Sequence, residues 1–453
     1  MAADVPGSRR RWRRSGTRRS SSWVLRSLVV LSVALVWLPV SAIASAGQHS
    51  ASRRAHPHRT RAGLVATLPS GGTLISVFCP AAGTPPHDDD QARIRGGVTL
   101  AGTGDPDDLR IPRCAAVGEN ETGAGPRSIA GLQRPTGRWL GTAVPGVRRE
   151  AGAMLSGVSC PAPGACIAVG AGFGRSGQSR PLALKWSGTR WRLMTVPYPR
   201  AHGGVGSRLT GVSCRVFTYC IAVGDNQTRH GAVALAELWN GSRWRLLRPV
   251  SEPHARASML DKVSCPREIS CMAVGTYITA SGQEFALAEH WNGARWRLRP
   301  ALSVAGAAGS VLSGVSCLVT SCIAVGSYQR GSATVLAERW NGATWSVLPA
   351  VSPGHGSASA LADVACQSAR SCTAVGYVAP HPGGSAPLIE AWNGARWQID
   401  RTPRRGRLAE LYGVTCPAPR RCVAVGEYVS RSGQRMELAE MWNGSTWSIQ
   451  RTG

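Results

Sequence analysis

The chain has 453 residues, with 52 Lys and Arg against 25 Asp and Glu, and a net charge of +27 carried almost entirely by Arg. This length allows two or three ordinary domains or one repeat-built domain. After the N-terminal region no apolar segment is long enough to span a bilayer, which excludes a protein with several transmembrane helices. Sixteen Trp stand against four Phe, and this imbalance indicates a repeated motif.

The N-terminal residues have the features of an export signal. Arginines cluster in the first 26 residues, an apolar stretch runs over 28–40, and small residues with the pattern Ala-x-Ala follow at 42–46. This order predicts a secretory signal peptide over 1–46, cleaved near Ala44 or Ala46, with an uncleaved anchor as the alternative. A basic disordered linker is expected over 47–62. We therefore expect the protein to be secreted or held at the cell surface.

Fourteen Cys follow the signal and form pairs along the chain. In an exported protein an even number of Cys implies disulfides. Each pair is expected to form a disulfide within its own repeat, between the end of one strand and the start of the next. Cys114 is in register with the later repeats, so residues 80–113 are interpreted as an insertion. The seven pairs are Cys79/Cys114, Cys160/Cys166, Cys214/Cys220, Cys265/Cys271, Cys317/Cys322, Cys366/Cys372 and Cys416/Cys422.

A pair of Trp residues five positions apart follows each Cys pair from the second onward. Five of the pairs read Trp-Asn-Gly-x-x-Trp, and equivalent Trp residues lie about 50 residues apart. A fixed period in this range indicates a solenoid, a propeller or an array. One repeat, 209–249, alternates as four short strands and ends its third strand in an Asn-Gly turn, which is typical of a propeller blade.

Together the repeats predict an all-β, seven-bladed propeller over 63–450, with four antiparallel strands and one disulfide in each blade. The Trp pairs are expected to fill the core between blades, rather than to stack on sugars. Glutamates recur two residues before the first Trp, at Glu237, Glu289, Glu338, Glu390 and Glu440. A catalytic pair would not recur in five blades, so a structural pairing is expected, with nearby Arg243, Arg295 or Arg396.

The closing half of each repeat, Val223-Gly224 through Trp244-Arg245-Leu246, resembles the kelch and galactose-oxidase-like propellers. The Ser-Cys-Pro…Cys-x-Ala-Val-Gly start together with Trp-Asn-Gly-x-x-Trp is similar to a set of secreted actinobacterial propeller proteins. The resemblance covers residues 63 to 450. It implies fold and export, but propellers carry many unrelated activities. Every Cys belongs to the repeat, so the copper chemistry of galactose oxidase is not implied.

Function is expected on the face of the ring formed by the loops between strands two and three and by the links between blades, because these segments differ between repeats. Candidate anion-binding residues on it are Arg175, Arg180, Arg200, Arg208, Arg229, Arg256, Arg404, Arg405 and Arg407; Arg330, Arg431 and Arg435 share the face. Ordinary solvated loop charge is the alternative. Two weaker hypotheses are a metal held by His202, His254 and His355, and calcium bound by the acidic insertion at 88–90 and 105–108, for which an acidic loop is the alternative.

No nucleophile elbow, zinc-protease helix or phosphate-binding loop is present in the sequence, and no catalytic residue, metal or cofactor is predicted. The sequence therefore favours a non-enzymatic, monomeric binding or scaffold propeller. Its expected partner is an anionic glycan, a cell-wall polymer or a protein. No specific nucleic acid is expected, and membrane contact is expected only through an uncleaved signal. The alternative is a polysaccharide lyase, hydrolase or oxidase with its site on the variable loop face.

Overall fold

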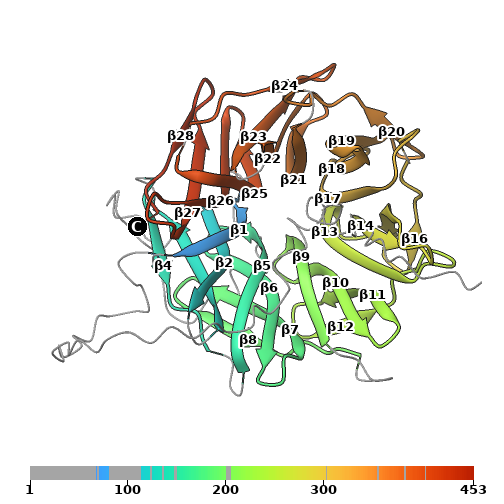
Figure 1. Ribbon diagram of the computed structural model, residues 1–453. Coiled ribbons are helices and arrows are strands. Elements are labelled where there is room, and N and C mark those ends of the chain that lie inside the picture. The colour runs from blue at the N-terminus through green and yellow to red at the C-terminus, as the bar shows by residue number, and fades with distance from the viewer. Residues whose placement is uncertain are drawn as a thin grey trace, which may run out of the picture. The chain divides into compact units, whose positions relative to one another are not determined.

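The computed structural model describes residues 68, 71–80, 114–122, 125–134, 137–146, 150–199, 206–302, 304–354, 357–381, 384–403 and 405–452. The predicted signal, the linker and the acidic insertion lie outside these residues. All the regular structure in the described part is β-strand, arranged around a centre (Figure 1). None of the described residues form a helix with the length and apolarity that a membrane span requires.

The strands occur in groups of four, ordered from the centre of the ring outward. The first strands are β1 (Gly72–Phe78), β5 (Glu150–Ala162), β9 (Gly206–Val216), β13 (Ala257–Arg267), β17 (Ser310–Cys317), β21 (Ala358–Ser368) and β25 (Arg407–Ala418). The second strands are β2 (Cys114–Thr122), β6 (Ala165–Gly174), β10 (Tyr219–Thr228), β14 (Ser270–Ile278), β18 (Cys322–Arg330), β22 (Ser371–His381) and β26 (Arg421–Val429).

The outer half of each group completes an antiparallel meander. The third strands are β3 (Gly125–Gln133), β7 (Ser179–Ser187), β11 (Gly231–Trp239), β15 (Glu284–Trp291), β19 (Ser332–Trp340), β23 (Gly384–Trp392) and β27 (Arg435–Trp442). The fourth strands are β4 (Trp139–Thr142), β8 (Trp191–Met194), β12 (Trp244–Leu247), β16 (Trp296–Leu298), β20 (Trp345–Leu348), β24 (Trp397–Ile399) and β28 (Trp447–Ile449).

The prediction of four-stranded antiparallel blades is confirmed, but seven separate sheets are not found. The described strands form five four-stranded sheets and one eight-stranded sheet, β5–β12. The larger sheet consists of two antiparallel meanders joined by a single parallel residue pair, Ser179 with Gly206. The expectation of seven separate sheets was wrong here because β7 and β9 approach closely enough at these two residues to bond.

The ring closes between its first and last strand groups. Each first strand contacts the first strand of the next group, and β1 in turn contacts β25, β26 and β27. Hydrogen bonds link this junction: the Gly72 N–H donates to Glu437 Oε1 over 3.1 Å, and the Cys79 N–H donates to Thr415 Oγ1 over 3.4 Å. A main-chain bond from the Trp139 N–H to the Arg451 carbonyl at 3.4 Å also joins the two ends. Among the described strands, β1–β4 and β25–β28 remain separate sheets.

All seven predicted disulfides are present, each within its own group of strands, and no free Cys occurs among the described residues. Cys214 and Cys220 are directly opposite one another in β9 and β10, with Cα atoms 4.0 Å apart. Such directly opposed positions bring the two Cβ atoms within bonding range. The bonds are Cys79–Cys114, Cys160–Cys166, Cys214–Cys220, Cys265–Cys271, Cys317–Cys322, Cys366–Cys372 and Cys416–Cys422. The first of them confirms the register assigned to the first repeat.

The cysteines were expected at the end of one strand and the start of the next, but in five of the seven pairs both strands continue past the disulfide. The second Cys of these pairs is the second residue of its strand: Cys166, Cys220, Cys271, Cys372 and Cys422. The final cross-strand pairs are Ala162 with Ala165, Val216 with Tyr219, Arg267 with Ser270, Ser368 with Ser371, and Ala418 with Arg421.

The spacing of these cysteines explains the difference. Five residues separate the two Cys of each of these pairs. Two of the five residues form the turn, two belong to the first strand and one belongs to the second strand. The unequal number gives a β-bulge beside each disulfide, where the strand register shifts. Cys317 and Cys322 enclose four residues, so their hairpin is symmetrical, and these two Cys are directly opposite with no shift between them.

The Trp pairs fill the space between neighbouring strand groups, as predicted. The two Trp of each pair are cross-strand partners, with ring centroids 5.4–5.7 Å apart. Trp186 and Trp191 pack with Ala115, Val117 and Leu132 of the preceding group.

Each Asn-Gly turn is fixed by the Asn side chain. Asn240 Oδ1 accepts from the Ser242 and Arg243 N–H groups. Only Gly241 of this turn has a positive φ. The recurring Asn-Gly therefore has a structural role at the end of each third strand, as predicted from the sequence.

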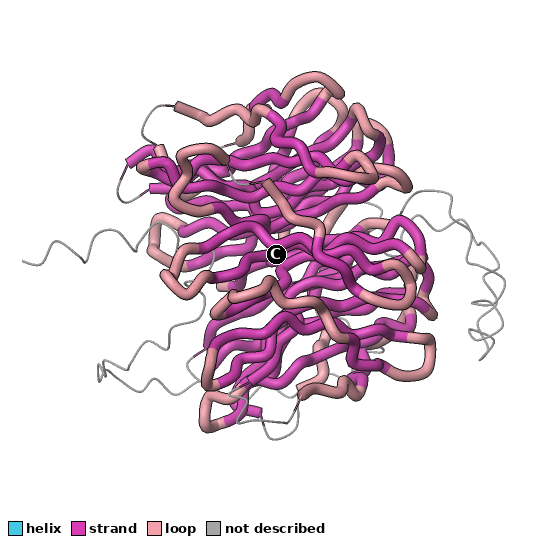
Figure 2. Tube along the Cα trace, turned by 90° about the vertical axis from the view of Figure 1, so that its right-hand side faces the viewer, coloured by secondary structure: helices cyan, strands magenta, loops and turns pink. Residues whose placement is uncertain are grey.

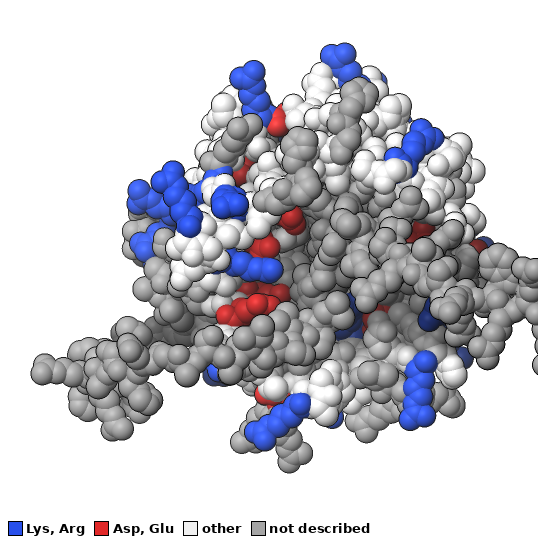
Figure 3. All heavy atoms as spheres, viewed as in Figure 1, with Lys and Arg blue, Asp and Glu red and all other residues white. Residues whose placement is uncertain are grey.

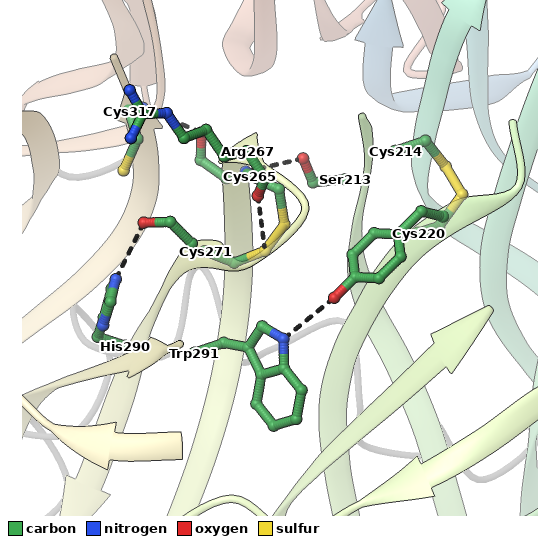
Figure 4. Close-up of a disulfide and its surroundings, with 12 residues drawn as sticks. Ser213, Cys214, Cys220, Cys265, Arg267, Cys271, His290, Trp291 and Cys317 are labelled. Carbon is green, nitrogen blue, oxygen red and sulfur yellow. Dashed lines mark hydrogen bonds between the residues drawn. A yellow bond between two sulfur atoms is a disulfide. The ribbon is translucent and has the colours of Figure 1, made fainter. Parts of the chain in front are cut away.

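A repeated serine also ties the groups together. The residue before the first Cys of one group accepts a hydrogen bond from the first Cys N–H of the next, as Ser213 Oγ does from Cys265 at 3.0 Å (Figure 4). The same bond joins Ser159 to Cys214, Ser264 to Cys317 and Ser316 to Cys366. The bond is lost before Cys416, because Ala365 has no hydroxyl.

Candidate functional site

The strands present their turns at two opposite faces of the ring. Figure 2 shows the turns gathered at the two ends of the strands. The Cys-to-Cys hairpins and the Trp-Asn-Gly turns share one face. The loops between second and third strands, and the links that lead to each first strand, share the other, which we call the variable face.

The candidate arginines of the variable face do not form one cluster. Arg175, Arg180, Arg229, Arg256, Arg405 and Arg407 are exposed, whereas Arg200 and Arg404 lie outside the described residues. Arg208 is half-buried and pairs with the fully buried carboxylate of Asp225, so it is held inside the protein. Figure 3 shows basic side chains around the rim of one face of the ring, with acidic side chains nearer its centre.

A row of three carboxylates lies at the junction between the last and first strand groups. Glu410 is directly opposite Glu427, and Glu427 is directly opposite Glu437, so the three side chains stand on one face of neighbouring strands β25, β26 and β27. Like charges directly opposite one another are destabilising unless they are compensated. The compensation comes from the groups that surround the row.

Four donors compensate the carboxylate row. The Tyr412 hydroxyl lies 3.0 Å from Glu410 Oε2 and 3.2 Å from Glu427 Oε1. Glu427 also accepts from the Thr73 hydroxyl and lies 3.6 Å from Arg435 Nη1, while Glu437 accepts from the Gly72 N–H. The residues come from both ends of the chain, so only ring closure brings them together.

The protonation of this junction favours hydrogen-bond donation by Tyr412. Burial, followed by the charges of Glu427 and Glu410, raises the pKa of the Tyr412 hydroxyl, so it stays protonated. Burial also raises the pKa of Glu410 and Glu437, and it raises the pKa of nearby Glu119 to about 7. The arrangement can accept hydrogen bonds from hydroxyl groups of a ligand, but Tyr412 is not activated as a nucleophile.

A second asymmetric feature lies where the first strands meet at the axis. Four first strands read Leu-x-Gly-Val at a bulge, and in one of them a Cβ on Gly314 would lie 2.7 Å from the Asp363 Cα. Two strands replace this glycine with charge. Lys262 on β13 reaches past β17 to Asp363 on β21, with Nζ 3.1 Å from Oδ2, and Asp363 also accepts from the Val414 N–H.

The carboxylate beside Lys262 is also perturbed. Burial raises the pKa of Asp261 to about 6, against the opposing effects of Arg208 and Lys262. Sequence reasoning missed these axial groups, and also missed Glu410, Tyr412 and Glu427. The available signal was the replacement of the small or polar residues that other repeats carry at the bulge, such as Ser156 and Ser313, by Asp261 and Tyr412.

The five repeated glutamates are fully buried, but the predicted pairing with arginines was wrong. No ion pair joins them to Arg243, Arg295 or Arg396 among the described residues. Three of them instead accept from the link that arrives from the preceding group: Glu289 from the Val250 N–H at 2.8 Å, Glu338 from Leu302 at 3.2 Å, and Glu390 from Val351 at 3.3 Å.

Glu237 and Glu440 have no such donor, and among the described residues neither oxygen of either carboxyl has a hydrogen-bond partner. Each donor in the other links stands six residues after the second Trp, and the equivalent positions here are Pro197 and Pro403. Proline has no N–H to donate. Burial raises the pKa of Glu237 and Glu440 to about 8, whereas burial opposed by the linker bond gives about 7 for Glu289, Glu338 and Glu390.

The metal hypotheses receive no support from the described residues. His254 is exposed, and His202 and His355 lie outside the described residues, as does the acidic insertion. The described part of the chain contains no group of three His, Cys, Asp or Glu side chains arranged to hold an ion. The sulfur atoms of Cys166, Cys271 and Cys422 are buried and bonded to their partners, so the role of these cysteines is structural.

Comparisons with known proteins reach no family. No family model matches the chain, and no curated protein matches it, so the kelch-like and actinobacterial resemblance stays a prediction. Among solved structures, a polysaccharide lyase described as an ulvan lyase is 9% identical, with a TM-score of 0.47 over 85% of this chain and 97% of its own. The fucose-binding lectin of Aleuria aurantia is 12% identical, with a TM-score of 0.39 over 66% and 95%.

A third similar structure is YCF48 from Cyanidioschyzon merolae, which is 12% identical, with a TM-score of 0.40 over 67% of this chain and 86% of its own. These values are too low to transfer a ligand or an activity to this chain. Function has to be argued from the residues described above.

Proposed function

We propose that the protein is an exported, monomeric, non-enzymatic propeller that binds an anionic polymer of the cell surface. The observation that carries this proposal is the set of exposed arginines on the variable face, Arg175, Arg180, Arg229, Arg256, Arg405 and Arg407, none of which forms an ion pair with a described acid. Arginine donates paired hydrogen bonds to carboxylate and sulfate groups, so an acidic polysaccharide suits this surface.

The buried glutamates strengthen the same argument. Five of the protein's 25 acidic residues, Glu237, Glu289, Glu338, Glu390 and Glu440, are fully buried. Their raised pKa values, about 7 to 8, keep a large share of them neutral near pH 7. The surface that a ligand meets is therefore more positive than the sequence charge suggests.

The proposal includes the architecture and the compartment. We take β5–β8 and β9–β12 as two blades, which gives a ring of seven, preceded by a signal over 1–46 and a linker over 47–62. The seven disulfides indicate an oxidising, extracytoplasmic environment, where wall polymers and acidic polysaccharides are the abundant polyanions.

Retention of the purified exported protein on heparin resin tests the proposal. Binding is expected at about 0.1 M salt and release as salt increases, because added ions screen exposed charges over about 10 Å or less. Passage through the resin at low salt would contradict polyanion binding, and selective capture of a protein from the cell surface would favour a protein ligand instead.

The alternative function, a polysaccharide-active enzyme, is favoured by one observation: Tyr412 bridges Glu410 and Glu427 at the ring junction. Acidic polysaccharides incubated with the protein would show new reducing ends or unsaturated sugars if it were a hydrolase or a lyase. Loss of that activity in both Tyr412→Phe and Glu427→Gln, with unchanged melting temperature, would establish the enzyme. Intact polymer after prolonged incubation would exclude these two reactions on the sugars tested.

A further inference from the structure

Three consecutive strand groups carry an Arg on both sides of the second Trp. The triplets are Arg190-Trp191-Arg192, Arg243-Trp244-Arg245 and Arg295-Trp296-Arg297. They stand at the start of the outermost strands β8, β12 and β16. The Trp of each triplet is buried, whereas both flanking arginines are exposed. Because the second of these arginines is the next strand residue after the Trp, it points to the opposite side of the sheet.

The backbone that presents these arginines is held in place. Asn240 Oδ1 accepts from the Arg243 N–H and Asn292 Oδ1 accepts from the Arg295 N–H, each at 2.9 Å. The Trp between the arginines is buried in each triplet, and in the first of them Trp191 Nε1 also donates to Thr142 Oγ1 of the preceding group at 3.0 Å. The cations therefore project from ordered edges of the ring, and ordering them costs less entropy on binding than it would for a loop.

Positive charge also accumulates across the strands in the first of these groups, where Arg192 is directly opposite Lys185. Arg297 is directly opposite His290, but burial and then the charges of Arg299 and Arg297 lower the pKa of His290, so this imidazole adds no charge near pH 7. Like charges in directly opposed positions destabilise a strand pair, and none of the six arginines of the triplets pairs with a described acid.

Two other groups show that the fold does not require these arginines. The equivalent triplets are Thr344-Trp345-Ser346 and Thr446-Trp447-Ser448. There the serine hydroxyls bond within their own sheet, Ser346 Oγ to the Arg339 carbonyl and Ser448 Oγ to the Met441 carbonyl, each at 3.3 Å. The Trp–Trp ring distances are similar with serine and with arginine, so the core does not need the arginine triplets.

We propose that the three Arg-Trp-Arg triplets form one continuous binding surface on the outer wall of the ring for an anionic polysaccharide. This inference rests on the proposed function and adds to the variable face a second contact surface along β8, β12 and β16. A linear polyanion can cross the edges of three neighbouring groups in succession, and each edge offers two guanidinium groups for its carboxylates or sulfates.

The decisive variant is Arg192→Ser/Arg245→Ser/Arg297→Ser, which installs the serine that β20 and β28 already carry. Its matched control is Arg215→Ser/Arg267→Ser/Arg370→Ser, which removes the same charge from exposed positions that belong neither to the variable-face set nor to the triplets. The wall variant is expected to bind heparin about tenfold more weakly or worse, because it removes three exposed ionic contacts whose small individual contributions add. The control is expected to lose threefold or less.

The outcomes separate this inference from the proposed function. A greater loss in the control, or an equal loss in both variants, overturns the wall surface while polyanion binding stands. Absence of heparin binding by the unchanged protein overturns both. Melting temperatures within a few degrees of the parent show that both variants are folded, as expected for surface substitutions.

A gain-of-binding pair tests whether continuity of the surface matters. Thr344→Arg/Ser346→Arg extends the surface into the next group along the chain, whereas Thr446→Arg/Ser448→Arg adds the same charge to β28, which does not adjoin β16. The first variant is expected to bind heparin at least twofold more tightly than the second. Equal tightening would mean that net charge alone controls binding, and the proposal of a continuous surface would be wrong.

Discussion

The links that follow β12 and β24 each reach a buried glutamate of the next strand group, but only the link after β12 donates a hydrogen bond to it. After β12 the Val250 N–H donates to Glu289. After β24 the equivalent residue is Pro403, and Glu440 is left without a partner. One backbone N–H in a link thus decides whether the glutamate of the next group is a clamp between two blades or a neutral acid that costs stability.

A third strand group has neither a bonded nor an unbonded glutamate beside its link. The link after β4 carries Pro145 at the equivalent position, and the next group has Leu184 where the five groups that follow it have glutamate. Leu184 is fully buried in the core cluster around Trp186 and Trp191. A link proline has no N–H to donate, so an apolar side chain such as Leu184 leaves no buried acceptor without a donor. Glu237 and Glu440 face a link proline as well, but each is a carboxyl that needs a donor.

The largest expected consequence is a fall in stability as pH rises. The folded-state pKa values of the five glutamates are raised from 4.5 to about 7 or 8, so the folded protein binds more protons than the unfolded chain between these values. The free energy of unfolding therefore decreases from about pH 5 to pH 8. Each glutamate contributes about 1.4 kcal/mol to this decrease for every pH unit over which it is neutral when folded and ionised when unfolded.

Urea unfolding between pH 5 and pH 8 measures how the free energy of unfolding changes with pH. Glu237→Gln/Glu440→Gln should make this change smaller, most of all toward pH 8. The control, Glu268→Gln, replaces an exposed acid and should leave the change with pH as it is. A stability that rises over this range in the parent would show that these carboxyls are ionised in the folded protein.

The next effect is a difference in sign between two identical substitutions. Glu440→Leu should stabilise the protein by about 1–3 kcal/mol, because it removes a buried polar group that has no partner. Glu338→Leu should destabilise it by about 1–3 kcal/mol, because the Leu302 N–H loses its acceptor. Melting temperatures at pH 7 give both values, and equal effects of one sign would mean that the linker bonds do not matter.

The repeated parts of this fold could be predicted from sequence because each signal occurs several times. Cys214 with Cys220, and Trp239 with Trp244, are cross-strand neighbours within a few residues of one another. The glutamates were visible as well, but their partners are backbone N–H groups supplied by links of differing sequence. The sequence therefore suggested an arginine close to each glutamate as its partner, whereas the actual donor is a backbone N–H 36 to 39 residues away.

The ring junction could not be predicted in the same way. Thr73 and Glu427 are 354 residues apart, and Tyr412 has no counterpart in the other repeats. Such contacts appear only once the order and closure of the blades are known. The eight-stranded sheet has a similar origin, since a single residue pair, Ser179 with Gly206, joins its halves.

A smaller effect is expected from giving the unpartnered carboxyl a donor. Pro403→Ala restores the missing N–H opposite Glu440 and should lower the pKa of this carboxyl from about 8 toward the value of about 7 found for Glu390. The free energy of unfolding at pH 8 should rise by about 1 kcal/mol, less the entropy that the unfolded chain gains without proline. Urea unfolding at pH 8 measures this change. Val351→Pro is the converse change and should raise the pKa of Glu390.

The smallest effect concerns the serine hydrogen bonds near the axis. Here too one strand group makes the bond and another lacks it, but the acceptor is a neutral hydroxyl. Ser316 Oγ accepts from the Cys366 N–H at 3.0 Å, whereas Ala365 offers nothing to Cys416. Ala365→Ser should add one bond and about 0.5–1.5 kcal/mol, and Ser316→Ala should remove a similar amount or slightly more, since it leaves a partly buried N–H without an acceptor. Urea unfolding of both variants with the disulfides intact provides the measurement. If Ala365→Ser has no effect while Ser316→Ala destabilises, the strands of the last two groups are too far apart at this point for the bond to form, and the groups are not evenly spaced around the axis.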